Sequence, residues 1–472
     1  MRTILLVGLL IAFGACGSSP PASKPALPAA PPAAAPGKAT AGAPPAGAPP
    51  SFPGAPATAA GRQLAWVLDS ITKRHGKVER AELEAHFDPA FLAKIPVEQA
   101  VKVFEQMGTQ LGDLTLVDAR SEEEQLIARA IAGGVKLRIS LTLSPATKKI
   151  AGMLIERDIE TGPPLASFGD ALRQAATLAP RAQLLVAALD HGACKPQQEL
   201  AASEPLAIGS TFKLYVLIAL ADRILAGKAA WSDEVAVRDD WKSLPSGTTQ
   251  NEPPGAKRTL ATLAERMISI SDNTAADHLL YTLGRRTVEA ALRATGHKTP
   301  ALDTPFLSTR ELFVFKLGLP ADEVERYLKL PEPRRRDYLD KTLATRAPGL
   351  DLTGAWKTAR RVDKLEWYAS SNDLCRAMAA LWTRGQDPKT KQVLDILGKN
   401  RGLPIDPKVW PYVGFKGGSE PGVLNMTYLL RRDDDKWFIV TLGFNAAEGS
   451  ALDDTKIFGL VSGVIDLLAR AR

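Results

Sequence analysis

The chain has 472 residues, of which 45% are hydrophobic and 24% charged, a balance typical of a globular protein with room for two or three domains. Its formal net charge of +7 is the difference between 59 basic and 52 acidic residues, which are interspersed along the sequence. Because no long basic run is combined with aromatic residues, the sequence argues against a nucleic-acid-binding protein.

Residues 1–16 are predicted to be a bacterial export signal that ends at a site of lipid attachment. Arg2 precedes an apolar run from Ile4 to Phe13, which is shorter than the stretch of about 20 residues that a membrane-spanning helix needs. The sequence Phe13-Gly14-Ala15-Cys16 resembles a lipobox, in which the cysteine is acylated and becomes the first mature residue. A plain secretory signal with an incidental cysteine is the alternative. We expect an exported protein of the cell envelope that acylated Cys16 anchors to a membrane.

Residues 17–60 are predicted to form a linker. Between Pro20 and Pro56 lie 13 of the 35 prolines, among many alanine and glycine residues. Such a composition cannot build a core and favours an extended spacer. An anchor followed by this stalk would let the rest of the chain reach away from the membrane.

Residues 61–165 are predicted to form a first, small domain. Apolar residues at helical spacing indicate helices near residues 64–71 and 97–104, and strands follow. In "VKLRISLTLS" (135–144) apolar and polar residues alternate, which predicts a strand with one buried face. Helices against one face of an antiparallel sheet resemble the cone-shaped α+β fold of steroid-isomerase-like domains, and we expect that fold here.

Residues 175–472 are predicted to form a second, larger domain. It opens with the strand-like segment "AQLLVAALD" (182–190), and helical patterns dominate from Thr211 to about Leu381. Strands return in "YVGFKGG", "GVLNMTYLL" and "KWFIVTLGF", before a last helix from about Asp454. Strands at both ends of a helical middle predict one antiparallel sheet built from both ends of the domain, plus an all-helical subdomain.

The two cysteines in this domain stand in different local contexts. Cys194 follows a polar turn, whereas Cys375 lies in a predicted helix. Export would permit a disulfide between them. Because their contexts differ, we expect two free thiols.

The segment "IGSTFKLYVLIAL" (208–220) places Lys213 in an apolar run, three residues after Ser210. A buried ammonium is costly, and a cation in the first turn opposes the helix dipole. Side chains at i and i+3 share a helix face, and burial favours a neutral amine that can accept a proton from the serine. The pair therefore predicts a nucleophile and its base. A second S-x-x-K, from Ser70 to Lys73, does not lead into an apolar helix and is assigned no function.

Two further motifs follow in order, Ser271-Asp272-Asn273 and Lys416-Gly417-Gly418-Ser419. Taken singly, the first would be a helix cap and the second a surface lysine before a bulge. Together with Ser210 and Lys213 they resemble the S-x-x-K, S-D-N and K-T-G motifs of class A β-lactamases and penicillin-binding proteins. The resemblance covers roughly residues 180–472 and implies the three-layer α/β fold of that family.

The resemblance also implies a role for each matching residue, without a metal or another cofactor. It implies an acylated nucleophile, its proton acceptor, a proton relay to the leaving group, and a lysine that assists the relay: Ser210, Lys213, Ser271 and Lys416. It further implies three substrate-binding residues, Asn273, Gly418 and Ser419. The backbone N–H groups of Ser210 and Ser419 would form the oxyanion hole. None of the five histidines stands in a G-x-S-x-G motif or at a zinc-type spacing, which argues against a classical catalytic triad and against a metallo-hydrolase.

Three departures from the family pattern concern the reaction. Gly417 replaces the usual hydroxyl residue of K-T-G, and Asn425 and Met426 stand where an arginine often binds a carboxylate. The E-x-x-L-N motif, whose glutamate activates the deacylating water, is missing. Glu311 and Glu366 are candidate substitutes, although each also fits a solvated surface acid. The sequence therefore contains the residues expected for acylation but lacks the motif that supplies the base for deacylation.

We expect a serine acyl hydrolase that acts on β-lactams, the substrate class that the resemblance implies. An esterase is an alternative, because expelling an alkoxide needs less protonation than expelling an amine. A D-alanyl-D-alanine peptidase is another. The missing glutamate favours a further alternative, a protein that binds β-lactams or peptidoglycan without turnover. The fate of the acyl group on Ser210 separates these functions.

Overall fold

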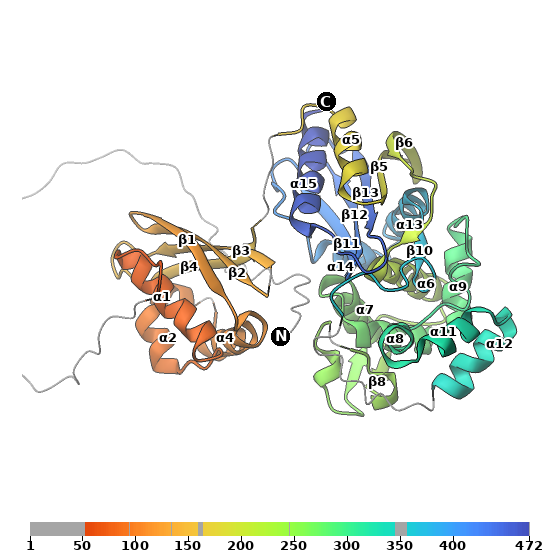
Figure 1. Cartoon of the computed structure of the whole chain (residues 1–472), viewed down its shortest axis with the longest axis horizontal. Coiled ribbons are helices and arrows are strands. Elements are labelled where there is room, and N and C mark those ends of the chain that lie inside the picture. The colour runs from red at the N-terminus through yellow and green to blue at the C-terminus, as the bar shows by residue number, and fades with distance from the viewer. Residues whose placement is uncertain are drawn as a thin grey trace, which may run out of the picture. The chain divides into compact units, whose positions relative to one another are not determined.

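A computed structural model of the chain describes residues 52–93, 95–133, 135–158, 164–244, 246–344 and 356–471. They form two compact units divided after Asp158 (Figure 1). The predicted export signal, Cys16 and most of the predicted linker lie outside the described residues. Across these ranges, none of the helices has the length and apolar character that crossing a membrane would require.

The first unit packs helices against one face of a four-stranded antiparallel sheet with the order β1-β2-β3-β4. Residues alternate between exposed and buried along β2, and Leu137, Ile139 and Leu141 of β3 are buried as their spacing predicts. The predicted sheet with one exposed face is therefore present. The elements are α1 (Ala59–Thr72), α2 (Arg80–His86), α3 (Pro89–Leu92), α4 (Val97–Leu111), β1 (Thr115–Glu122), β2 (Gln125–Ala132), β3 (Val135–Leu143) and β4 (Ile150–Arg157).

The second unit is built on a five-stranded antiparallel sheet with the order β11-β12-β13-β5-β6. Two of its strands come from the start of the unit and three from its end, which confirms the prediction of one sheet assembled from both ends. The strands are β5 (Arg181–Asp190), β6 (Ala193–Leu200), β11 (Tyr412–Glu420), β12 (Val423–Arg431) and β13 (Trp437–Asn445).

Helices cover both faces of this sheet, which gives three layers (Figure 1). On one face, α5 (Phe168–Leu178) and α15 (Asp454–Arg470) bury their apolar sides. On the other face lie α13 (Ser371–Arg384) and α6 (Lys213–Leu225). Every residue of α6 from its start to Ala221 is buried, because the helix lies between the sheet and the remaining helices.

These remaining helices form the predicted helical subdomain. Short strands accompany these helices. One of them, β7 (Leu206–Ala207), pairs with β10 (Tyr368–Ala369) and ends three residues before Ser210. The other elements are η1 (Gly209–Phe212), β8 (Glu234–Ala236), η2 (Asp239–Trp241), η3 (Thr249–Asn251), β9 (Lys257–Thr259), α7 (Leu260–Ser269), α8 (Asn273–Leu283), α9 (Arg285–Ala294), α10 (Thr309–Phe313), η4 (Val314–Gly318), α11 (Ala321–Leu328), α12 (Glu332–Asp337), η5 (Tyr338–Leu343) and α14 (Gln392–Gly398).

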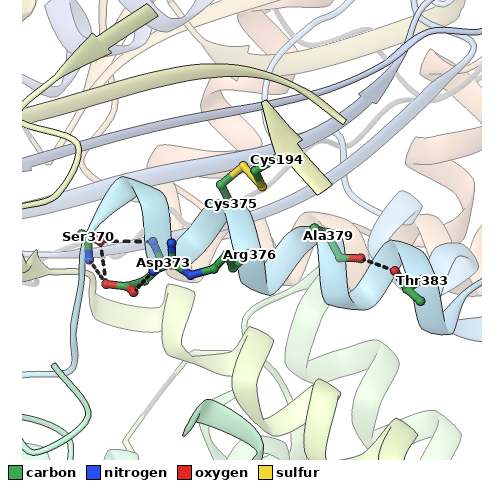
Figure 2. The surroundings of a disulfide bond; sticks show 7 residues. All are labelled: Cys194, Ser370, Asp373, Cys375, Arg376, Ala379 and Thr383. Atoms are coloured by element: carbon green, nitrogen blue, oxygen red, sulfur yellow. Dashed lines mark hydrogen bonds and ion pairs between the residues drawn. A yellow bond between two sulfur atoms is a disulfide. The ribbon is translucent and has the colours of Figure 1, made fainter. Parts of the chain in front are cut away.

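Cys194 and Cys375 form a disulfide, so the prediction of two free thiols is wrong (Figure 2). Their Cα atoms lie 6.3 Å apart although 181 positions separate them in the sequence. The local contexts were a poor guide because the pairing is tertiary. Helix α13 packs across β5 and β6, and this packing brings Cys375 of the helix to Cys194 of β6.

We predict that the double variant Cys194→Ser/Cys375→Ser lowers the free energy of unfolding of the second unit by about 2–5 kcal/mol, because the disulfide restricts the unfolded chain. Urea unfolding without reductant measures the difference. As a control, reductant should destabilise the parent protein to the level of the variant and leave the variant unchanged. The Cys16→Ala protein, unfolded without reductant, should have no reactive thiol. Detection of two reactive thiols in it would contradict the disulfide.

Candidate active site

The structure brings Ser210 and Lys213 together at the junction of η1 and α6. Lys213 Nζ lies 3.2 Å from Ser210 Oγ. Lys213 is fully buried, whereas Ser210 remains partly exposed. The serine can therefore meet a substrate while its amine partner is screened from water.

Among the described residues, the hydrogen-bond partners of the Lys213 amine are all uncharged. Besides Ser210, it contacts the Ser271 carbonyl oxygen at 2.6 Å, Ser271 Oγ at 3.2 Å and Asn273 Oδ1 at 2.7 Å. Burial lowers the pKa of Lys213 to about 7, although the nearby carboxylates of Asp272 and Asp277 oppose the shift. A substantial fraction of the amine is therefore neutral at physiological pH and able to accept a proton.

Ser271 has a backbone conformation that is rare for a serine. Its φ is 55°, in the left-handed region, immediately before α8 begins. The following Asp272 fixes this turn: one carboxylate oxygen caps α8 at Ala275 N, and the other accepts from the N–H groups of Thr248 and Thr249, each at 2.8 Å. The strained turn directs Ser271 Oγ into the site.

Lys416 of β11 completes the chain of polar groups. Its Nζ lies 3.0 Å from Ser271 Oγ and also donates to the Gly417 carbonyl. Burial and the neighbouring Lys213 lower the pKa of Lys416. Ser271 Oγ therefore lies between two lysine amines, as a proton relay requires.

The predicted oxyanion hole depends on a close approach between two backbones. A Cβ atom at Gly418 would lie 1.9 Å from the Ile208 carbonyl oxygen and 2.7 Å from Ser210 N. A Cβ at Gly209, whose φ is 48°, would lie 3.2 Å from Ser419 N. Glycine at these positions lets β11 lie directly against η1, with the N–H groups of Ser210 and Ser419 at the contact.

Asn425 does not take the place of a carboxylate-binding arginine. Its Oδ1 accepts hydrogen bonds from Thr211 Oγ1 and Thr427 Oγ1, each at 2.9 Å, and its side chain is fully buried. Because Thr211 follows Ser210 in η1, its hydrogen bond to Asn425 ties the nucleophile segment to β12.

The structure adds Thr309 and Ser243, which the sequence analysis missed. Thr309 Oγ1 donates to Ser243 Oγ at 2.7 Å and lies 3.3 Å from the Asn273 carbonyl oxygen. The carboxylate of Asp277 holds Thr309 in place by accepting from its N–H at 2.7 Å. The sequence signal was a capping box, in which Ser308 and Glu311 mark the start of α10, but this motif predicts a helix start and no site.

Both candidate deacylation acids are committed to other partners. Glu311 pairs with Arg285 at 2.7 Å and accepts from Ser308 N. Glu366 pairs with Lys316. Among the residues that the structure describes, no carboxylate forms a hydrogen bond with Ser210 or Lys213. Neither acid is a solvated surface group, because both are buried.

The second S-x-x-K motif is structural. Ser70 Oγ donates to the Trp66 carbonyl at 2.8 Å within α1, and Lys73 forms an ion pair with Asp69 at 2.8 Å. The two side chains of the motif therefore face different partners.

Comparisons with known proteins agree with the fold of the second unit. The model of the beta-lactamase enzyme family matches residues 171–465, and the model of the ORF 12 gene product N-terminal region matches residues 55–147. No curated protein matches the chain.

The solved structures that match the chain are distant from it in sequence. A β-lactamase from Sphaerobacter thermophilus is 19% identical, with 63% of this chain and 95% of that chain covered and a TM-score of 0.43. One from Burkholderia phymatum is 17% identical, with coverages of 64% and 96% and a TM-score of 0.43. PBP-A, a point mutant of which has also been solved as an acyl-enzyme complex with penicillin G, is 16% identical, with coverages of 65% and 99% and a TM-score of 0.41. Because the family model matches more than half of its residues, the chain belongs to the beta-lactamase enzyme family.

Proposed function

We propose that the chain is a serine hydrolase of the class A β-lactamase type, in which Ser210 forms an acyl-enzyme with a β-lactam. The observation that carries the proposal is the buried chain of contacts from Ser210 Oγ through Lys213 Nζ and Ser271 Oγ to Lys416 Nζ. A serine hydroxyl is a weak nucleophile unless an adjacent base accepts its proton. The amine of Lys213 lies within hydrogen-bond distance of Ser210 Oγ, and burial lowers its pKa to about 7.

In the proposed acylation, the substrate carbonyl oxygen lies between the N–H groups of Ser210 and Ser419. Ser210 Oγ attacks the carbonyl carbon while its proton passes to Lys213. The developing oxyanion is stabilised by the two fixed N–H donors in a site screened from water. Ser271 then gives its proton to the leaving nitrogen or oxygen and regains one from Lys213, as the bond from the carbonyl carbon to the leaving group breaks. Lys416 stabilises the relay, and Asn273 binds the substrate amide.

Deacylation is the weaker half of this reaction. A positioned base typically contributes about 10²–10⁴-fold to such a step. Glu311 and Glu366 are held in buried ion pairs and are not free for this role. We therefore infer that acylation outpaces hydrolysis and that esters turn over faster than β-lactams.

Two parts of the chain outside this site also enter the proposal. The first unit, with helices on one face of its sheet, fits a steroid-isomerase-like domain. Acylated Cys16 would hold the protein at a membrane of the bacterial cell envelope, with the proline-rich segment as a stalk.

An esterase on a related acyl substrate and a non-turnover β-lactam- or peptidoglycan-binding protein remain the alternative functions, because both use the same acylation machinery.

The proposed function predicts a burst. After rapid mixing with a chromogenic cephalosporin, the wild-type protein should release about one equivalent of product and then turn over slowly, whereas a chromogenic ester should turn over steadily. Ser210→Ala should abolish the burst and the covalent adduct detected by intact-mass spectrometry, and Ser70→Ala should change neither.

Three results would separate or reject these functions. An adduct that survives Ser210→Ala would reject the site. A linear cephalosporin trace at an ordinary enzymatic rate, roughly 10–10³ per second, would reject slow deacylation. A stable adduct with the ester as well as the cephalosporin would favour the non-turnover function.

The low pKa of Lys213 predicts a pH dependence. The amine acts when neutral, so the single-turnover acylation rate should rise with pH through a midpoint near pH 7, the pKa given by burial, and level off above it. Lys213→Ala should reduce acylation by about 10²–10⁴-fold and abolish this dependence. Lys73→Ala is the matched control and should keep the parent profile. A midpoint near the ordinary lysine value would mean that Lys213 is not the base.

The anchoring proposal predicts that Cys16→Ala moves the protein from the detergent-soluble membrane fraction to the soluble fraction of the envelope, because the acyl chains that hold it at the membrane are lost. Fractionation followed by immunoblotting measures the change, and Lys73→Ala, which leaves Cys16 and the disulfide intact, is the control. Unchanged partitioning of the Cys16→Ala protein would reject the lipid anchor.

A further inference from the structure

A second buried cluster of charged groups lies outside the contacts of the proposed reaction. Lys316 belongs to η4, a π-helical turn that directly continues α10, and its ammonium contacts the carboxyl groups of both Glu366 and Glu420. The three side chains are 0%, 0% and 6% exposed. Short π-helical segments are frequent at functional sites. Buried ion pairs contribute little net stability, so stability alone does not account for this cluster.

One member of the cluster lies at the end of the strand that forms the oxyanion hole. Glu420 is the last residue of β11 and follows Ser419 directly. Side chains at alternate positions share one face of a strand, so Glu420 lies on the same face as Lys416 and Gly418. The contact with Lys316 therefore fixes the strand end next to the Ser419 N–H group.

A second member lies beside the segment that carries the nucleophile. Glu366 precedes Trp367, whose carbonyl oxygen accepts from Ile208 N at 3.0 Å. The Trp367 ring stacks on Phe212, with 3.9 Å between the ring centroids. Trp367 thus contacts the chain on both sides of Ser210, and Glu366 connects this support to Lys316.

Lys316 joins the two glutamates from a third segment of the chain. Helix α10, which η4 continues, begins at Thr309 beside the Asn273 carbonyl. The guanidinium of Arg360 donates to the Lys316 carbonyl oxygen at 2.8 Å, which fixes the backbone of η4 as well. Arg360 therefore fixes the backbone of Lys316, and the two glutamates fix its ammonium group.

The charges in the cluster balance if one carboxyl group is protonated. Burial and the neighbouring Glu366 raise the pKa of Glu420, whereas the two glutamates raise the pKa of Lys316. A raised pKa favours the neutral acid form of Glu420 and the ammonium form of Lys316. The cluster then holds three chain segments together by polar contacts.

We propose that Lys316, Glu366 and Glu420 are positioning residues that set the oxyanion hole, by fixing the end of β11 against the segment that supports Ser210. The inference rests on the proposed function, because it takes the N–H groups of Ser210 and Ser419 as the oxyanion donors. The cluster touches no reacting atom and acts through the distance between these two groups.

The test uses Glu420→Ala and Glu420→Gln in the full-length protein. The alanine variant removes the contact between β11 and the cluster but leaves the Lys316–Glu366 ion pair in place. The glutamine variant keeps the size of the side chain and puts a neutral hydrogen-bonding group in place of the carboxyl group. Asp322→Ala, which breaks an exposed ion pair with Arg326 in α11, is the matched control.

We expect Glu420→Ala to slow acylation by about 10–10²-fold with little change in substrate binding, since losing one oxyanion donor outright costs about 10²–10³-fold. The affinity for an arylboronic acid, whose tetrahedral adduct with Ser210 places an oxygen in the oxyanion hole, should fall by a similar factor. Glu420→Gln and Asp322→Ala should stay within about threefold of the parent, because both keep the contacts that position the donors.

Parent-like acylation and boronate affinity in a folded Glu420→Ala protein would overturn the inference, and so would equal losses in Glu420→Gln and Glu420→Ala. Should Glu420→Ala not fold, Lys316→Met/Glu366→Gln removes both charges together and is expected to show the same loss of boronate affinity. Parent-like affinity in that variant would also overturn it. If the parent itself forms no adduct at Ser210, the proposed function fails instead, which keeps the two failures distinguishable.

Discussion

The burial of one lysine amine is the constraint on which the rest of the site depends. Helix α6 lies between the sheet and the helical subdomain, so Lys213 at its start has no access to water. Its partners are a carbonyl, two hydroxyls and an amide oxygen, which accept hydrogen bonds but carry no charge. A carboxylate in direct contact would hold the ammonium form. Asp272 instead directs its carboxylate at backbone N–H groups, so its charge only moderates the effect of burial on the pKa of Lys213.

This arrangement requires backbone from distant parts of the chain to approach closely. The Ser271 carbonyl and hydroxyl reach the same amine because residue 271 adopts a left-handed conformation, which the hydrogen bonds of Asp272 stabilise. On the opposite side, Gly418 lets β11 approach η1 more closely than any side chain would allow. One residue that departs from the family motif, Asn425, also serves the packing. Asn425 supports Thr211 from within the sheet and does not face a substrate carboxylate.

The features that could be predicted from the sequence are those encoded within a few neighbouring residues. The spacing of Ser210 and Lys213, the Ser271 to Asn273 motif, the alternation along β3 of the first sheet and the apolar strand segments of the second sheet are local signals. The disulfide, the contact of Thr309 with Asn273 and the Lys316 cluster depend on packing between segments that are far apart. Lys316 and Glu420, for example, are 104 positions apart. Glu311 and Glu366 were named as candidate substitutes for the deacylation glutamate, but no local pattern reveals that each has a buried cationic partner.

Because these acids are engaged, the proposed reaction assigns water activation to the group already beside Ser210. Lys213 lies within hydrogen-bond distance of Ser210 Oγ, and its pKa of about 7 leaves it partly neutral once the leaving group has taken a proton. The same amine could then receive a proton from water and return one to Oγ as the acyl ester breaks. An ester substrate releases its alcohol, which clears the space beside Lys213 for that water. A β-lactam keeps its ring-opened amine attached to the acyl group, so the amine still occupies the approach to the ester carbonyl. In the proposed reaction, a site in which no carboxylate of the described residues contacts Ser210 or Lys213 would distinguish the two substrate classes by what remains bound after acylation, even though both would acylate the same serine.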